Sequence, residues 1–214
     1  MEAEFWHKKW QTGDIGFHTA SANPLLIAHF SALKLTPGQT IFVPLCGKTL
    51  DIHWLLAQGL HVKGIDLSEI AIRELFAELG LSPRVQQLGD LLHYQADKID
   101  IYVGDVFALQ AEQLGQVDAI YDRAALVALP ASLRRDYARH LQAISQRAPQ
   151  LLIAHEYQQD LMNGPPFAIT ADLVADLYQT NYQCELLARV AIEGGFKGKI
   201  PADEAVWLLR AHGA

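Results

Sequence analysis

The chain has 214 residues, of which half are apolar and 19% are charged, and its formal net charge at pH 7 is −7. This composition is typical of a soluble globular protein, and it excludes a disordered or collagen-like chain because enough apolar surface is present to offset the chain entropy. The negative charge argues against nucleic acid as a partner, since phosphates require a basic surface. At this length we expect a single domain spanning residues 1–214.

The location of the protein is predicted from what its sequence lacks. No apolar run approaches the roughly 18 residues that would span a bilayer. The start of the chain, Met1–Glu4, is acidic and does not have the basic-then-apolar order of a signal peptide. Cys46 and Cys184 form no Cys-x-x-Cys pair, so both are expected to be reduced. We therefore expect a cytoplasmic protein with no membrane partner.

Residues 1–35 have helical patterns. Trp6 and Trp10 are four positions apart and share one face of a helix, a spacing that is also common in ordinary core residues. Asn23 followed by Pro24 predicts a helix N-cap and first turn. This segment is expected to be a helical N-terminal cover.

Beyond residue 40, short apolar runs alternate with amphipathic segments. The runs predict seven strands, at residues 41–43, 61–65, 99–103, 117–121, 151–154, 184–192 and 205–209. Helices are predicted at residues 50–58, 68–79, 133–144 and 170–178, with Ser68 and Thr170 as N-caps. Residues 81–98 show no readable pattern. This alternation of strands and helices predicts an α/β fold. We expect a doubly wound and mostly parallel seven-stranded sheet, with an antiparallel hairpin at its C-terminal edge.

In such a sheet, ligands bind beyond the carboxyl ends of the strands, near the switch in strand order. This rule selects four places: residues 44–51, Asp66, residues 104–106, and the pair Asp122-Arg123. Each of these places has a possible role in binding a ligand and an alternative, purely structural explanation.

The first place contains Gly47-Lys48-Thr49, which resembles the end of a phosphate-binding loop. That loop requires a further glycine at position 42, where Phe42 stands, and the dinucleotide pattern G-x-G-x-x-G is also missing. A triphosphate or dinucleotide site is therefore disfavoured. The single Gly47 predicts a tight turn on which a phosphate-free ligand can lie against the backbone.

Asp66 ends the second predicted strand, where a carboxylate can accept hydrogen bonds from both hydroxyls of a ribose. The alternative is an acid that flanks the helix beginning at Ser68. At the end of the third strand, Asp105 could accept from the amine of an adenine while Val106 packs on the ring; alternatively, Gly104-Asp105 is a common turn.

Arg123 ends the fourth strand, and its guanidinium matches the geometry of a carboxylate. The alternative is a local salt bridge with Asp122. A ribose acid, an adenine turn and no phosphate loop together fit S-adenosylmethionine, a cofactor with a sulfonium and an amino-acid tail in place of phosphates.

These residues also occur in motifs of a known family. The chain resembles the thiopurine S-methyltransferases of bacteria in five motifs: Trp6-x-x-x-Trp10, Gly16-Phe17-His18, Pro44-Leu45-Cys46-Gly47-Lys48, Asp122-Arg123-x-Ala125-Leu126-Val127 and Gly164-Pro165-Pro166-Phe167. The resemblance implies a Rossmann-like fold and S-adenosylmethionine as methyl donor. It implies that Trp10, Leu45, Asp66 and Arg123 bind this cofactor, that Asp105 and Val106 border its adenine, and that Phe17 forms a wall of the acceptor pocket.

The chain departs from the family pattern in two places. The family usually has Glu at position 66, and the shorter Asp66 is expected to keep the ribose contact with a small shift. Residues 194–200 do not align securely, and Lys197 and Lys199 stand near a position where the family has an arginine that faces the substrate.

The reaction implied by the resemblance is in-line methyl transfer to the sulfur of an aromatic or heterocyclic thiol such as a thiopurine. Selenium and tellurium compounds are further acceptors associated with bacterial members. The protein mainly has to align the reacting atoms, so no general base is named, and Arg123 is the one candidate for stabilising a thiolate. We expect a monomer.

Other readings remain open. One is a non-catalytic binding protein with the same fold, and the other is a nicotinamide oxidoreductase, which the missing glycines disfavour. A metal site is disfavoured because His155-Glu156 lacks a second histidine at position 159. Cys46 is predicted to be a packed residue and not a nucleophile.

Overall fold

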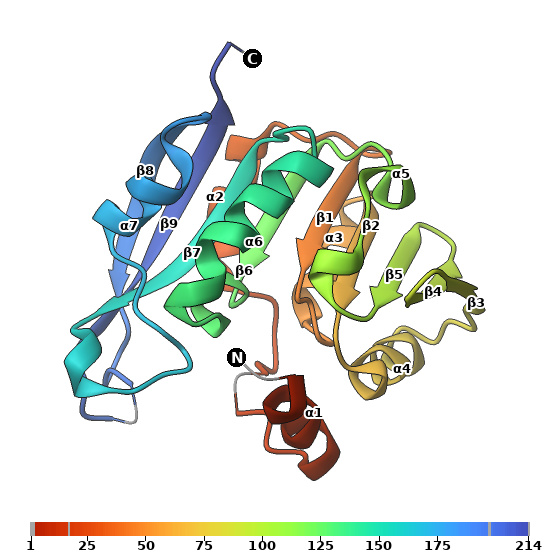
Figure 1. The fold of residues 1–214 in the computed structure, drawn as a ribbon, viewed down its shortest axis with the longest axis horizontal. Helices are drawn as coiled ribbons and strands as arrows, with labels where there is room; N and C mark the ends of the chain where they lie inside the picture. The colour runs from red at the N-terminus through yellow and green to blue at the C-terminus, as the bar shows by residue number, and fades with distance from the viewer. Residues whose placement is uncertain (1–2, 17, 197, 214) are drawn as a thin grey trace.

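The computed structural model describes residues 3–16, 18–196 and 198–213, with a twisted nine-stranded sheet through the centre (Figure 1). The strand order is β3-β4-β5-β2-β1-β6-β7-β9-β8. The strands are β1 (Thr40–Pro44), β2 (His61–Asp66), β3 (Arg84–Leu88), β4 (Leu91–Ala96), β5 (Ile99–Val103), β6 (Ala119–Arg123), β7 (Gln150–Tyr157), β8 (Tyr182–Ala191) and β9 (Ala202–Ala211).

The five central strands, from β5 to β7, are parallel to one another, and the strands on either side of them are antiparallel. The predicted α/β class, the parallel centre and the C-terminal hairpin of β8 and β9 are confirmed. The predicted number of seven strands is wrong, because β3 and β4 occupy residues 81–98. Strand β3 is almost entirely exposed, so it lacks the apolar run that marks a buried strand.

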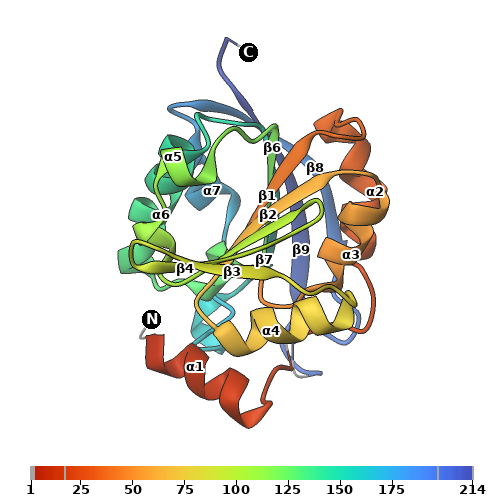
Figure 2. The same cartoon turned by 90° about the vertical axis from the view of Figure 1, so that its right-hand side faces the viewer.

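Helices cover both faces of the sheet, as Figure 2 shows. They are α1 (Ala3–Thr12), α2 (Pro24–His29), α3 (Leu50–Ala57), α4 (Glu69–Glu78), α5 (Ala111–Leu114), α6 (Ala131–Ile144) and α7 (Ala171–Tyr178). Helices α2 and α3 lie on one face, and α5, α6 and α7 lie on the other. The predicted N-caps Asn23, Ser68 and Thr170 are confirmed, since each side chain accepts a backbone N–H of the first helical turn.

Each face of the sheet has its own apolar core. On the α2 face, Ile72, Leu75 and Phe76 of α4 are buried at the spacing of one helix stripe. On the opposite face, α6 buries Tyr137 and Leu141 against β6 and β7. Burial on both faces explains why the central strands read as unbroken apolar runs.

Helix α1 lies beyond the carboxyl ends of the central strands and caps no sheet face (Figure 1). Its one buried residue is Trp10, which is 7% exposed. Trp10 thus packs into the edge of the sheet where the candidate site residues were predicted, and α1 also contacts α4. Within the described part of the chain, no helix has the length and apolar character needed to cross a membrane.

Candidate active site at the carboxyl edge of the sheet

The switch in strand order lies at β1, which pairs with β2 on one side and with β6 on the other. The chain therefore leaves β1 and β6 toward opposite faces of the sheet (Figure 2), the arrangement beside which ligands bind in open α/β sheets. The predicted residues after β1, β2, β5 and β6 all lie at this edge of the sheet.

The turn after β1 is built around Gly47. Leu45 and Gly47 both have a positive φ, 48° and 50°, so the chain bends sharply at the strand end. A Cβ at position 47 would lie 2.9 Å from Cζ2 of Trp10. Glycine is thus needed for the bend and for the close approach of the Trp10 ring. This contact joins Trp10 to the predicted cofactor turn, and the burial of the side chain also fits the alternative of a core residue.

Lys48 points toward helix α4. Its Nζ lies 2.8 Å from Oε2 of Glu74 and 2.8 Å from Oε1 of Glu78. Hydrogen bonds to Glu74 and then Glu78 raise the pKa of Lys48. The lysine therefore fastens the turn to α4 and does not face a ligand as the lysine of a phosphate-binding loop does.

Asp66 is anchored at the end of β2 and is 9% exposed. Its Oδ2 accepts the N–H of Gly47 at 2.7 Å, and its Oδ1 accepts the N–H of Ser68 at 2.8 Å. Burial raises the pKa of Asp66, and these hydrogen bonds from the backbone oppose that rise. Each carboxylate oxygen keeps a further lone pair for a ligand hydroxyl. The helix-flanking contact of the alternative explanation is thus present, and it leaves acceptor positions of the carboxylate unused.

The turn after β5 lies beside Asp66, because the N–H of Gly104 donates to the carbonyl of Asp66 at 2.9 Å. A Cβ at position 104 would lie 2.5 Å from Cδ2 of Leu91, so only glycine fits. Asp105 accepts the N–H of Phe107 at 3.0 Å, which is the turn contact of the plainer alternative. Val106 is 8% exposed, and its carbonyl contacts His140.

Asp122 and Arg123 point to opposite faces of β6. Asp122 is fully buried and accepts from the hydroxyl of Tyr137 at 2.8 Å and from the N–H of Leu126 at 3.2 Å. Burial raises the pKa of Asp122 to about 6. Among the described residues no ion pair joins Asp122 to Arg123, so the alternative of a local salt bridge is wrong. The Nε of Arg123 is buried and has no hydrogen-bond partner in the described part of the chain.

A polar cluster that no sequence pattern predicted lies next to Arg123. Nε2 of His155 on β7 is 3.6 Å from Oε1 of Glu204 on β9. His155 lowers the pKa of Glu204, and the charge of Arg123 contributes to this effect. Glu204 lies far from His155 in the sequence, and only the antiparallel pairing of β7 with β9 makes the two residues neighbours.

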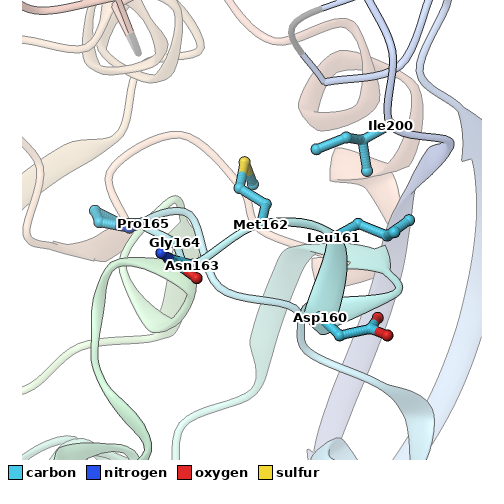
Figure 3. Close-up of a pocket in the computed structure, with 7 residues that line it drawn as sticks. All are labelled: Asp160, Leu161, Met162, Asn163, Gly164, Pro165 and Ile200. Carbon is cyan, nitrogen blue, oxygen red and sulfur yellow. The ribbon is translucent and has the colours of Figure 1, made fainter.

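A pocket of about 340 Å³ lies at the same edge, between the loop after β7 and the loop that joins β8 to β9 (Figure 3). It is lined by Asp160, Leu161, Met162, Asn163, Gly164, Pro165 and Ile200. The loop after β7, which forms one wall of this pocket, contains the sequence motif Gly164-Pro165-Pro166-Phe167. Phe17 and Lys197, predicted to face the acceptor, lie outside the described residues, and Lys199 is exposed on the second loop.

The structure also bears on nucleophile and metal chemistry. Burial raises the pKa of the Cys46 thiol well above its usual range, and nearby Asp66 adds to the rise. A thiol that stays protonated is a poor nucleophile, which agrees with the prediction of a packed residue. In the described ranges, no group of three His, Cys, Asp or Glu side chains could hold a metal ion.

Comparison with known proteins identifies a family that this chain resembles over nearly its whole length. The sequence model described as "Thiopurine S-methyltransferase (TPMT)" matches residues 1–207. A thiopurine S-methyltransferase of Xanthobacter autotrophicus is 50% identical over 210 residues, which cover 98% of this chain and 99% of the relative. That of Teredinibacter turnerae is 50% identical over 209 residues, 98% of this chain and 97% of the relative.

Among solved structures, a methyltransferase of Burkholderia thailandensis has a similar fold. It is the 1,6-didemethyltoxoflavin-N1-methyltransferase, whose structure contains 1,6-didemethyltoxoflavin and S-adenosylhomocysteine. The TM-score is 0.67 at 14% sequence identity, over 97% of this chain and 87% of the other. At this identity the similarity describes the fold alone.

Proposed function

Because the chain belongs to the thiopurine S-methyltransferase family, whose methyl donor is S-adenosylmethionine, we propose that it methylates the sulfur of an aromatic or heterocyclic thiol such as a thiopurine. The observation that carries this proposal is Asp66. Its carboxylate is fixed by two backbone N–H groups at the switch point of the sheet and keeps lone pairs for the two ribose hydroxyls.

The charges around the turn fit a cofactor without phosphates. Lys48 is held by Glu74 and Glu78, so the turn presents no free lysine to a phosphate. Arg123 has a buried Nε without a partner among the described residues, and a guanidinium suits the carboxylate of an amino-acid tail. We therefore assign the ribose to Asp66 and the amino-acid tail to the neighbourhood of Arg123.

The remaining cofactor residues follow the edge of the sheet. Leu45 and Gly47 form the turn on which the cofactor would lie, and Trp10 covers this turn. Asp105 and Val106 would border the adenine, because the Gly104 N–H ties their turn to Asp66. Residues 1–35 would thus form a cover over the active site of a single domain.

When bound, S-adenosylmethionine supplies an electrophilic methyl group on a positively charged sulfur. The task of the protein is to orient the acceptor sulfur in line with that methyl group, a contribution of about 7–11 kcal/mol in favourable cases. Arg123 would stabilise the negative charge of a thiolate acceptor. Phe17 would form one wall of the acceptor pocket, and Trp10 with α1 would exclude water from the cofactor.

The test combines binding and turnover. Calorimetry with S-adenosylhomocysteine is expected to detect binding, and labelled S-adenosylmethionine is expected to transfer its methyl group to 6-mercaptopurine. Selenol and tellurite acceptors, run in parallel, define whether the acceptor range extends beyond sulfur. Binding of S-adenosylhomocysteine without transfer to any acceptor would contradict the proposed reaction and favour a non-catalytic binding protein.

Gel filtration tests the expected monomer, and cell fractionation tests the expected cytoplasmic location.

A further inference from the structure

Two of the buried polar atoms that lack partners in the described chain lie on one face of the sheet, near the carboxyl ends of β6 and β7. One is Nε of Arg123 on β6, and the other is Nδ1 of His155 on β7. Arg123 stands opposite Ile153 in the parallel register, so His155 lies two residues further along β7 and on the same face. Burying a polar atom without a hydrogen bond is costly. Two such atoms on neighbouring strands indicate a place where a polar ligand group binds.

The other nitrogen of His155 has a defined neighbour. Nε2 lies 3.6 Å from Oε1 of Glu204, its cross-strand partner on β9. His155 holds the pKa of Glu204 below its usual range, with further contributions from the Arg123 charge and the Asn23 side chain. Glu204 is therefore charged at neutral pH, and its negative charge favours the tautomer with the proton on Nε2. The lone pair of the imidazole then lies on Nδ1.

The loop between β8 and β9, which supplies Ile200 to the pocket of Figure 3, also packs against His155. The Phe196 ring packs edge-on against His155 at 4.9 Å between centroids and against Tyr157 at 5.4 Å. Phe196 belongs to the loop between β8 and β9, where its N–H donates to the carbonyl of Ile200, a residue that lines the pocket. The titratable groups around His155 are Glu204 on β9, Arg123 on β6 and Tyr157 on its own strand.

We propose that Nδ1 of His155 accepts the proton of the acceptor thiol, and that Glu204 is the positioning residue for this imidazole. The inference rests on the proposed function. In this step the S–H bond breaks and its proton moves to Nδ1, while the sulfur electron pair forms the new S–CH₃ bond. The C–S bond to the donor sulfur breaks, and its electron pair stays on that sulfur as a neutral thioether. Arg123 stabilises the negative charge on the acceptor sulfur as the proton leaves.

This role predicts that the need for His155 depends on the acidity of the acceptor. A thiol that is ionised at neutral pH has no proton to give, so His155 does nothing for its methylation. An alkyl thiol is largely protonated at neutral pH, because its pKa lies near the value of a free cysteine, about 8.5. Its methylation gains the full benefit of a positioned base, typically 10²–10⁴-fold.

The experiment compares wild type and His155→Gln with two acceptors. The probes are 4-nitrothiophenol, which is a thiolate at neutral pH, and benzyl mercaptan, which is largely a thiol. We expect His155→Gln to lower kcat/KM for benzyl mercaptan by about 100-fold or more and for 4-nitrothiophenol by less than about 3-fold. Glu204→Gln, which keeps the size of the side chain, is expected to act in the same direction by about 10-fold.

The matched control is His93→Gln. His93 is also a buried histidine beside a carboxylate, with Nε2 2.8 Å from Oδ1 of Asp100, but it lies on β4 at the opposite side of the sheet. Its substitution should leave the ratio of the two kcat/KM values unchanged. Calorimetry with S-adenosylhomocysteine should give wild-type affinity for His155→Gln.

Equal losses with both thiols would overturn the proton role, because a residue that only supports the pocket affects both acceptors alike. Unchanged activity with benzyl mercaptan in His155→Gln and in Glu204→Gln would overturn it as well. A wild-type protein that binds S-adenosylhomocysteine but methylates neither thiol would contradict the proposed function itself and, with it, this step.

Discussion

Asp66 and Gly47 are joined by a hydrogen bond of 2.7 Å from the Gly47 N–H to Oδ2 of Asp66. This contact locks the turn after β1 to the end of β2, next to the point between β1 and β6 at which the strand order changes. The carboxylate that would bind the ribose thus also shapes the turn on which the cofactor would lie.

We predict that Asp66→Ala weakens binding of S-adenosylhomocysteine by about 1–3 kcal/mol, the scale of a lost charged hydrogen-bond acceptor. Titration calorimetry measures the change. Asp118→Ala is a suitable control, because Oδ2 of Asp118 accepts the Thr40 N–H at 2.7 Å at the opposite edge of the sheet. It should reduce stability without changing affinity. Wild-type affinity in Asp66→Ala would refute the ribose assignment.

Gly47→Ala should loosen helix α1. The added Cβ would lie 2.9 Å from the Trp10 ring, on a residue whose φ is +50°. Strain of this kind costs on the order of 1–3 kcal/mol, so we expect weaker S-adenosylhomocysteine binding and faster proteolysis within the first twenty residues. Gly80→Ala is the control. Gly80 has a similar φ of +66°, but a Cβ added there would have no atom within 4 Å, so this variant has the backbone strain without the clash. Equal effects of the two substitutions would show that the Trp10 contact does not matter.

Asp122 should make stability depend on pH. Its pKa is raised to about 6 in the folded chain, against about 3.9 in an unfolded one. The folded state therefore binds the proton more tightly, and its stability falls as pH rises from about 4 to about 6, by up to about 3 kcal/mol from this group. Denaturant unfolding of Asp122→Asn, which has no such proton to lose, should show a flatter pH dependence over this range. If the free energy of unfolding changed with pH in the same way in wild type and in Asp122→Asn, Asp122 would not be the source of the pH dependence.

Phe17→Ala tests the division between the acceptor and the cofactor pockets. The resemblance assigns Phe17 to the acceptor wall, so its loss should raise the KM of the thiol and leave the S-adenosylhomocysteine affinity nearly unchanged. Steady-state kinetics with 6-mercaptopurine and calorimetry give the two quantities. A similar loss in both would mean that the two pockets are wrongly divided.

The sequence by itself determined the parts of this protein that depend on local chemistry. The central strands are covered on both sides, so their apolar runs are visible in the sequence, and Asn23, Ser68 and Thr170 act as helix caps within three residues of themselves. The motif around Gly47 predicted a tight turn because its geometry is set by neighbours in the chain.

Other features were decided only by the tertiary structure. Strands β3 and β4 were unreadable because an exposed edge strand needs no apolar pattern. The partner of Asp122, the hydroxyl of Tyr137 on α6, became visible only in the tertiary structure, because the two residues come from different elements. The pair of His155 and Glu204 is separated by almost fifty residues, and it forms because β9 lies antiparallel beside β7. Such pairings depend on strand order, which local sequence patterns do not encode.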